Sequence, residues 1–482
     1  MTTGTAMQPD GAALPGTGSP PAASSGATFA RYATNAEREH GFEPLRIEGR
    51  IPEGLRGTMY RNGPGLLTTF NQPYEHSFEG DGAVSAVRLD GLEQRATGAY
   101  HVVESEGLRF ERDAGRPMFS SRAPWRTRMG NALRRRFKNN ANTSILVWRD
   151  RLFALADGAR PTELDAGMLT TVGETDLDGL IAQTFSAHPH DVVARSSIYN
   201  FGVRFGRKTQ IDLFELPYKH RPARRLGQVE LAHPVMLHDF VATERHLVFL
   251  VSPARLVLWR AALMLTPVSK LVRWSEQDGT EVIVVPIDAP RSVTRFRVDP
   301  FFQWHFAGGF ERGGEIAVDL VRYPRLNSLH QTGERAARCG TYHRAIIDLA
   351  RRSLTSTEVT PVGCEFPQID PRRSGSAFRY AWCVADGAAG DSITRIDTET
   401  GKTVVYDLAA SERASEPLFW PRAPDSGESD GWVLSLIYDA STHTSHVAVF
   451  DANGLQDGPV ARVHFDHHVP PTFHGKWVPS PA

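Results

Sequence analysis

Short runs of apolar or alternating residues, separated by turn-forming residues, recur along most of the chain. They are clearest at residues 82–91, 143–150, 246–251, 281–288 and 431–439. Such runs are typical of β-strands, because successive side chains of a strand point to opposite faces of a sheet. No long helical pattern separates them from about residue 32 onward. The pattern therefore predicts an all-β protein, and it leaves a sandwich, a barrel and a propeller open.

Four histidines stand in unusual local sequences at widely spaced points of the chain. They are His188 in Ser-Ala-His-Pro, His238 in Leu-His-Asp-Phe, His305 in Phe-Phe-Gln-Trp-His and His474 in Phe-His-Gly-Lys-Trp. Their separations are too large and irregular for one helix or loop, so a common metal site must gather them from distant elements. Among the all-β architectures a propeller, with its central axis, does this best. Imidazole suits Fe(II), Zn, Cu and Ni alike, so ligand type permits iron without selecting it.

Length and composition narrow the class of protein. The 482 residues are 41% hydrophobic and 23% charged, which is enough for a large buried core. With 54 Lys+Arg and 55 Asp+Glu, the net charge of −1 provides no global field for a nucleic acid, and we expect no nucleic-acid partner. No clean internal repeat is visible, so periodicity leaves the number of propeller blades open.

The cysteines and the chain ends indicate location and domain organisation. Cys339, Cys364 and Cys383 form no C-x-x-C pair and are odd in number, which argues against a disulfide framework and favours the cytoplasm. Residues 1–28 are rich in Gly, Ala, Pro, Ser and Thr and lack the pattern of a signal peptide, so we expect a disordered tail. We expect residues 29–482 to form a single domain.

Several ordered motifs carry a resemblance to a known family. Residues 55–65 read Leu-Arg-Gly-Thr-Met-Tyr-Arg-Asn-Gly-Pro-Gly, residues 76–82 read His-Ser-Phe-Glu-Gly-Asp-Gly, and the four histidine motifs follow in order. From residue 41 to residue 479 the chain resembles the carotenoid cleavage oxygenases, which include the apocarotenoid oxygenases and the visual-cycle isomerase. The resemblance implies a seven-bladed β-propeller whose loops and short helices form a cap over an axial iron. It also implies one Fe(II) per chain, held by the four histidines, with O₂ as co-substrate.

The resemblance further implies that three acids orient the histidine ligands from behind. Glu365 and Glu416 match two of these positions. At the third, Asp157 stands where the family usually has glutamate, which leaves three outcomes open: the backbone moves inward, a water bridges the gap, or one ligand is held less firmly. Gly308 likewise replaces a residue with an amide side chain, so we expect a shifted loop or an ordered water beside it.

Other side chains are candidates for handling substrate. Thr143 matches a threonine that approaches the open side of the iron in apocarotenoid oxygenases, and its alternative is a strand threonine with a satisfied hydroxyl. Aromatic residues beside the ligand motifs are candidate tunnel walls, although core packing is the commoner role of such rings. These candidates for substrate binding are Phe240, Phe302, Trp304, Phe306 and Phe473.

The activity implied by the resemblance is oxidative cleavage of a C=C bond in a hydrophobic polyene, a carotenoid or an apocarotenoid, to two carbonyl products. Two alternatives remain: cleavage of a stilbene-type phenolic alkene, and a propeller that isomerises its substrate or is inactive. The protein need not supply a nucleophile, and the sequence has no G-x-S-x-G, P-loop or H-E-x-x-H motif.

Two segments indicate contact with a membrane surface. Residues 256–274 combine apolar, aromatic and basic side chains, but Arg260, Pro267, Lys270 and Arg273 interrupt them, so no transmembrane helix is predicted. Residues 122–138 add a basic run with Trp125 and Phe137 interleaved. The alternatives are a helix packed on the propeller and a solvated charged face. Peripheral association with the inner face of the membrane is the hypothesis.

Overall fold

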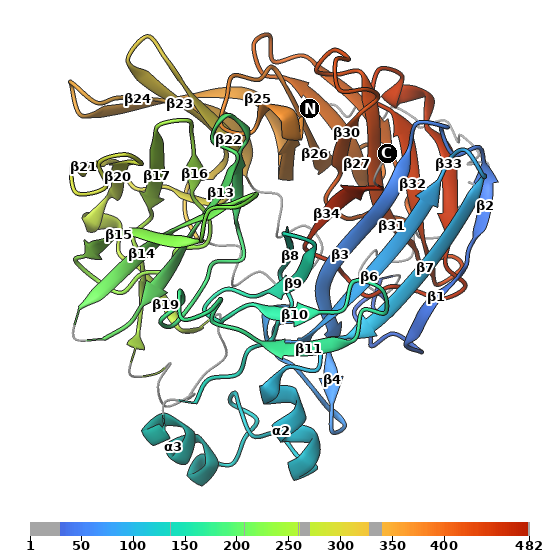
Figure 1. Cartoon of the computed structure of the whole chain (residues 1–482), viewed down its shortest axis with the longest axis horizontal. Helices are drawn as coiled ribbons and strands as arrows, with labels where there is room; N and C mark the ends of the chain where they lie inside the picture. The colour runs from blue at the N-terminus through green and yellow to red at the C-terminus, as the bar shows by residue number, and fades with distance from the viewer. Residues whose placement is uncertain are drawn as a thin grey trace, which may run out of the picture.

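A computed structural model describes residues 29–480 except 135, 207, 259, 261–269 and 327–339. The predicted tail, residue Cys339 and much of the segment 256–274 therefore lie outside the described residues. The described chain is mostly β-structure, as the sequence predicts, and its sheets stand around a common centre (Figure 1).

The first sheet joins strands from both ends of the described chain. Its order is β1 (His40–Pro44), β7 (Arg95–Val102), β6 (Asp81–Asp90), β3 (Arg56–Leu66) and β34 (His474–Pro479). In the last pair, Asn62 lies opposite His474 and Gly57 opposite Pro479. The C-terminal strand thus completes a sheet that the N-terminal strands begin.

Three four-stranded antiparallel sheets follow in chain order. The second sheet contains β8 (Ser144–Trp148), β9 (Arg151–Leu155), β10 (Thr162–Leu164) and β11 (Thr171–Glu174). The third contains β12 (His190–Val192), β13 (Ser197–Arg204), β14 (Thr209–Pro217) and β15 (Arg224–Leu231). The fourth contains β16 (Val241–Ala242), β17 (His246–Val251), β20 (Thr280–Pro286) and β21 (Thr294–Val298).

A long strand, β25 (Ser353–Ile369), links two four-stranded ladders into one seven-stranded sheet. Its first part, up to Gly363, pairs with β24 (Thr341–Asp348), which continues to β23 (Glu315–Tyr323) and β22 (Phe302–Arg312). Its second part, from Cys364, pairs with β26 (Tyr380–Asp386), which continues to β27 (Asp391–Asp397) and β28 (Thr403–Asp407).

The remaining large sheet also contains a strand from the N-terminal part of the described chain. Its order is β2 (Arg46–Gly49), β33 (Pro459–His464), β32 (Thr444–Asp451), β31 (Gly431–Asp439) and β29 (Glu412–Ala414), and β30 (Leu418–Pro421) also pairs with β31. Two small hairpins stand apart from these sheets. They are β4 (Thr68–Thr69) with β5 (Gln72–Pro73), and β18 (Ala254–Leu256) with β19 (Val272–Trp274).

Apolar side chains between neighbouring sheets form the core. In β17, Leu247, Phe249 and Val251 pack in one cluster, while Val248 and Leu250 pack in the next. Both faces of this strand are buried, which explains why residues 246–251 read as a continuous apolar run. Similar clusters join each sheet or ladder to the next, and Val87 of β6 shares a cluster with Val449 of β32, so the packing returns to the first sheet.

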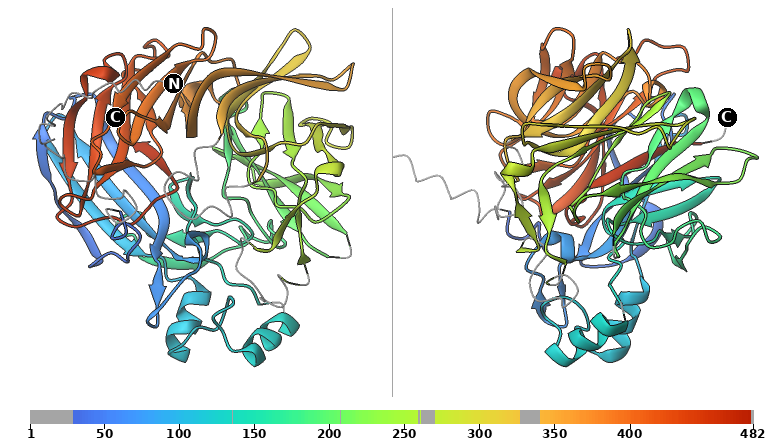
Figure 2. Two further views of the ribbon diagram at one scale, coloured as in Figure 1. Left: turned by 180° about the vertical axis from the view of Figure 1, so that it is seen from behind. Right: turned by 90° about the vertical axis from the view of Figure 1, so that its left-hand side faces the viewer.

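Two helices project from one side of this ring (Figures 1 and 2). Helix α2 (Glu106–Ala114) begins after Ser105, whose side chain accepts a hydrogen bond from the Leu108 N–H, and it ends at Gly115 in the left-handed conformation. Helix α3 (Trp125–Arg134) follows it. In the part of the chain that the structure describes, no helix is both long and apolar enough to cross a bilayer.

Candidate metal centre

The four predicted histidines meet at the centre of the ring. One nitrogen from each of His188, His238, His305 and His474 lies within 4.8 Å of the others. His305 stands on β22 and His474 opens β34, whereas His188 and His238 stand in the loops before β12 and β16. The ring centroids of neighbouring imidazoles are 4.3–5.1 Å apart, from His188–His238 to His238–His305.

The nitrogens of this cluster fit a cation. The Nε2 atom of His188 is buried and has no hydrogen-bond partner among the described residues. The Nε2 atoms of His238 and His305 face each other at 3.2 Å, where two lone pairs would repel without a proton or a metal ion between them. A set of four imidazoles without thiolate or carboxylate matches Fe(II) and also other first-row metals.

Carboxylates on the far side of three rings fix their orientation. The Nδ1 atom of His474 is 2.8 Å from Glu416 Oε1, that of His305 is 2.6 Å from Glu365 Oε2, and that of His238 is 2.5 Å from Asp157 Oδ2. Because each carboxylate engages Nδ1, the proton is held there and the lone pair of Nε2 is free for a metal ion. All three predicted acids therefore contact the predicted histidines.

Glu416 belongs to a buried ionic network that sequence reasoning missed. Arg61 on β3 donates from Nη1 to Glu416 Oε2 at 2.9 Å, and both side chains are 1% exposed. Glu416 also accepts from the side chain of Gln368 and from the N–H of Gly475, each at 2.8–2.9 Å. Arg61 lies in the motif at residues 55–65. A charged residue inside a strand that is otherwise buried was the feature that could have indicated a buried ion pair.

Asp157 reaches its histidine directly in spite of its shorter side chain. Its second oxygen accepts a hydrogen bond from the Ala187 N–H at 3.2 Å, beside the loop that carries His188. The direct contact leaves no place for a bridging water between Asp157 and His238, which was one of the three outcomes left open by the sequence. The side chain is 38% exposed, however, against 5% for Glu365 and 1% for Glu416.

Among the described residues, no acid holds His188 in this way. The nearest carboxylate, Asp239 Oδ1, is 3.9 Å from its Nδ1 atom, beyond hydrogen-bond distance. Asp239 instead bonds His190 Nε2 at 2.8 Å and accepts from the N–H groups of Phe240 and Phe306. Asp239 thus braces the loops around the site without holding a member of the four-histidine cluster, a role not predicted from the sequence.

Burial and charge set the proton affinity of the cluster. Burial and the neighbouring imidazoles hold the pKa of His188 well below its usual value. Burial also lowers the pKa of His474, although Glu416 acts against it. Burial disfavours the charged form of His305 too, but Glu365 outweighs it and raises the pKa of this ring. The low pKa values of His188 and His474 favour the neutral imidazole that binds metal.

Thr143 lies beside the four-histidine cluster, where its backbone contacts that of His474. Its hydroxyl donates to Asn142 Oδ1 at 3.1 Å, and its carbonyl oxygen accepts from the His474 N–H at 3.1 Å. The side chain is buried. The hydroxyl is satisfied, as in the alternative interpretation made from the sequence, but Thr143 lies just before β8 and not within a strand. Its methyl group is the part of the side chain without a polar contact.

The five candidate aromatic residues divide into two groups. Trp304 lies edge-on to His238 with ring centroids 5.0 Å apart, and Phe78, not predicted, contacts both Trp304 and Phe473 at 5.8 and 5.4 Å. Phe302 packs on Trp304 at 4.9 Å. Phe240 is enclosed by Phe201 and Phe249, and Phe306 packs in another core cluster.

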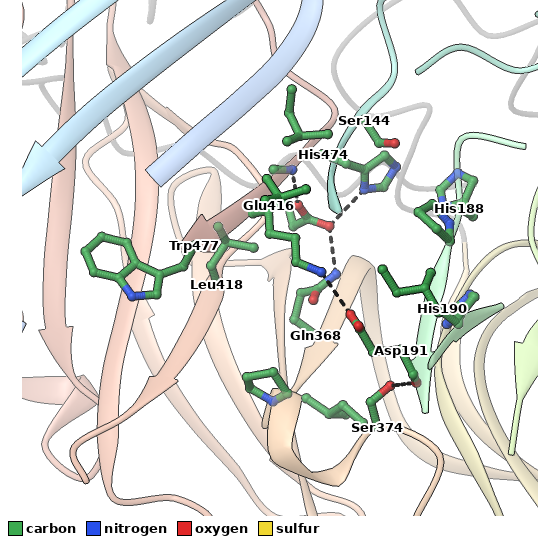
Figure 3. A pocket seen from close by; sticks show the side chains of 18 of the residues that line it. Ser144, His188, His190, Asp191, Gln368, Ser374, Glu416, Leu418, His474 and Trp477 are labelled. Carbon is green, nitrogen blue, oxygen red and sulfur yellow. Dashed lines mark hydrogen bonds and ion pairs between the residues drawn. The ribbon is translucent and has the colours of Figure 1, made fainter. Parts of the chain in front are cut away.

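A cavity of about 630 Å³ borders the four-histidine cluster (Figure 3). His188, His305 and His474 line it, together with Glu416, His190 and Gln368. Farther along it, Lys476 Nζ and Asp191 Oδ2 form an ion pair at 2.8 Å, and Tyr218 donates to the other oxygen of Asp191. The cavity thus combines these polar groups with apolar lining residues such as Ile145, Phe306 and Leu418.

Gly308 stands at an irregular point of β22. A Cβ atom there would lie 3.1 Å from Ile369 Cδ1 and 3.2 Å from Phe378 Cε1. The pairing of β22 with β23 shifts register between Phe306 and Gly308. Apolar side chains therefore border this glycine, and a larger residue would require them to move.

Comparisons with known proteins agree with this geometry. Residues 33–479 match the family model described as retinal pigment epithelial membrane protein. The chain is 31% identical to the apocarotenoid-15,15'-oxygenase of Synechocystis sp. over 90% of this chain and 92% of that protein. It is 26% identical to lignostilbene-alpha,beta-dioxygenase isozyme III of Sphingomonas paucimobilis over 90% of this chain and 93% of that protein.

Solved structures of the Synechocystis apocarotenoid oxygenase have the same fold. A glutamate-to-aspartate variant of it superposes with a TM-score of 0.87, at 29% identity, covering 94% of this chain and 99% of that one. A cobalt-substituted form superposes with a TM-score of 0.86 at the same identity and coverage.

Proposed function

The chain belongs to the retinal pigment epithelial membrane protein family, and on that premise we propose that it is a non-haem Fe(II) oxygenase. The reaction is oxidative cleavage of a C=C bond in a carotenoid or apocarotenoid, which gives two carbonyl products. The convergence of four imidazole nitrogens, with three carboxylates behind them, carries this proposal. Relatives named as apocarotenoid and carotenoid oxygenases support the substrate class.

The protein's own side chains would hold the metal ion and orient the nitrogens that bind it. His188, His238, His305 and His474 would hold one Fe(II), and Asp157, Glu365 and Glu416 keep the ligating nitrogens directed inward. Iron, when bound, supplies the redox chemistry that lets O₂ react with an electron-rich double bond. No general base or nucleophile is required from the chain, because positioning and exclusion of water are what this chemistry demands of it.

An aromatic wall on one side of the cluster suits a polyene. Phe78 contacts both Trp304 and Phe473 edge to face, Trp304 stands edge-on to His238, and Phe302 extends this wall. We assign substrate contact to this group and to Phe306, which lines the cavity, ahead of Phe240, which is enclosed by Phe201 and Phe249. The methyl group of Thr143 would restrict access to the open side of the metal.

The oxygenase assignment is tested by reconstitution. Protein loaded with Fe(II) without oxygen is mixed with O₂ and an apocarotenal, a full-length carotenoid or a hydroxystilbene. We expect loss of the long-wavelength band and two aldehydes with one of the two polyenes. Cleavage of the hydroxystilbene alone would establish the phenolic alternative, and iron-loaded protein that leaves all three unchanged would contradict the proposal and favour an isomerase or an inactive propeller.

A matched pair of variants tests the ligand assignment. His238→Gln removes a proposed ligand, whereas His233→Gln removes an exposed histidine five residues earlier on the same segment. We expect the first variant to lose bound iron and the second to retain it, measured as iron per chain after gel filtration. Equal iron in both would refute the assignment of His238.

We also propose that the ring is a seven-bladed propeller, capped by loops and short helices, and that residues 29–482 act as one domain. Dividing the seven-stranded sheet at β25 into its two ladders supports this blade count, together with the five other large sheets. Pairing of β34 with β3, and of β2 with β33, supports closure between the two ends of the chain.

Peripheral contact with a membrane is a further part of the proposal. In helix α3, Trp125, Met129 and Leu133 recur every four residues and are all exposed, Leu133 by 82% and Trp125 by 63%. Arg126 and Arg134 are exposed on the same helix, which projects from the ring (Figure 1). An exposed apolar row flanked by arginines suits an anionic lipid surface.

Lys138, at the end of the basic run 122–138, does not add to this exposed basic surface as the sequence suggested, because it is buried against Asp81 and Glu111.

Liposome flotation tests this contact. We expect the double substitution Trp125→Glu and Leu133→Glu to abolish flotation with vesicles that contain anionic lipid, while Leu92→Glu, at a 60% exposed leucine elsewhere, leaves it intact. Unchanged flotation of the double variant would reject α3 as the contact.

The buried free thiols Cys364 and Cys383 support the cytoplasm as the compartment.

A further inference from the structure

Away from the four-histidine cluster, Glu37, His443 and His468 form a second group of metal-binding side chains. One ligand atom of each lies within 4.8 Å of those of the other two. Glu37 precedes β1, His443 stands in the turn between β31 and β32, and His468 lies between β33 and β34. Three segments that are distant in the chain thus bring a carboxylate and two imidazoles together.

His468 carries an unsatisfied nitrogen in this group. The residue is 1% exposed, and its Nδ1 atom has no hydrogen-bond partner among the described residues. Its Nε2 atom is 3.4 Å from the Thr34 carbonyl oxygen, which can accept the ring proton. A buried polar atom without a partner costs about 1–3 kcal/mol, and a bound cation would satisfy the Nδ1 lone pair.

A hydrogen bond also orients the ring of His443. Its Nδ1 atom is 2.9 Å from the hydroxyl of Tyr438, which can accept the ring proton and leave the Nε2 lone pair for a metal ion. The two imidazoles stack with centroids 4.2 Å apart and ring planes 24° apart, so one ring must turn before both lone pairs meet at one ion. The backbone of His443 lies in the left-handed region, at φ 54°, which is uncommon for a residue other than glycine.

We propose that Glu37, His443 and His468 bind a divalent transition-metal ion, for which Zn²⁺ is the best match. Two imidazole nitrogens and one carboxylate form a common zinc ligand set, and an exposed site leaves the fourth position to water. Ligands of tetrahedral zinc are about 3.4 Å apart. The three ligand atoms here lie within 4.8 Å of one another, so binding would draw the exposed Glu37 side chain and the His443 ring toward His468.

The ion would fasten the segment before β1 to the sheet that contains β31 and β32. Tyr32 already stacks on Tyr438 of β31 with ring centroids 4.4 Å apart, and Phe29 contacts the same ring. A metal bond from Glu37 would add a polar anchor to this aromatic contact. The site therefore has a structural role, separate from the oxygenase centre.

Zinc binding to the iron-loaded full chain tests the proposal. The variants are His443→Asn and Glu37→Gln, with His220→Asn as the matched control, because His220 is an exposed turn histidine with φ 55°. Asparagine tolerates the left-handed backbone at both histidine positions. Zn²⁺ is titrated against a chromophoric chelator, and bound iron is measured in parallel.

We expect one Zn²⁺ per chain at constant iron content, retained in His220→Asn. Binding should weaken more than about 100-fold in His443→Asn, beyond the cost of losing an outer partner of a ligand. Glu37→Gln should weaken it as well, and Zn²⁺ should raise the Tm of the unsubstituted protein but not that of His443→Asn. The proposal fails if no Zn²⁺ binds, if its uptake equals the iron released, or if His443→Asn binds Zn²⁺ as the control does.

Discussion

The two halves of the four-histidine cluster are supported very differently. His305 and His474 stand on strands and lean on glutamates that are 5% and 1% exposed. His188 and His238 stand on loops, where His238 contacts the 38% exposed Asp157 and His188 has no acid within hydrogen-bond distance among the described residues. Buried carboxylates thus orient both rings of the strand half, whereas one more exposed carboxylate orients a single ring of the loop half.

The largest effect on iron retention is expected for Glu416→Gln. The change removes the acceptor of His474 and leaves Arg61 as a buried unpaired charge, which costs about 3–5 kcal/mol of unfolding free energy. Urea unfolding and iron per chain measure the two losses. Glu53→Gln, at an exposed ion pair with Arg50, is the control and should change little. Similar results for both variants would remove the distinction between buried and exposed support.

A smaller loss is expected for Glu365→Gln. Without its carboxylate, His305 loses a 2.6 Å partner, and iron affinity should fall about 10–100-fold. Tyr323→Phe, which removes only the hydroxyl that donates to Glu365, should fall between this variant and the unsubstituted protein. Competition with a ferrous chelator gives the affinities, and a larger effect of Tyr323→Phe would contradict this order.

Asp157→Asn should have a still smaller effect, within about tenfold, because water can replace the partner of His238 at this exposed position. Asp157→Glu should bring no gain, since the aspartate already contacts the ring directly. The same chelator competition checks both variants. A loss in Asp157→Asn as large as that in Glu365→Gln would mean that the two halves are equally dependent on their acids.

The smallest change in iron retention is expected for Asp239→Asn. This carboxylate bonds His190 and two backbone N–H groups, but none of the four clustered histidines. The variant should lose unfolding free energy, about 1–3 kcal/mol, while its iron content stays unchanged. Iron loss parallel to that of Asp157→Asn would show that Asp239 supports His188 across the 3.9 Å gap.

The sequence predicted what local patterns encode. Short apolar runs located strands closely, since those at 246–251 and 431–439 coincide with β17 and β31. Motif resemblance identified the histidines and the three acids. It could not reveal the pair between Arg61 and Glu416, because 355 positions separate the partners and only the closed ring brings them together. Burial of Lys138 escaped prediction for the same reason, as its partner Asp81 lies 57 positions away.

The pairing of β34 with β3 has a consequence for assembly of the metal centre. His474 opens a strand that follows every other described strand in chain order, yet it lies opposite Asn62, next to Arg61. A chain that lacks β34 would supply only three of the four clustered histidines and would leave β3 without one of its two neighbours. On the proposed function, complete coordination of the metal ion therefore requires that strands from the two ends of the described chain have paired.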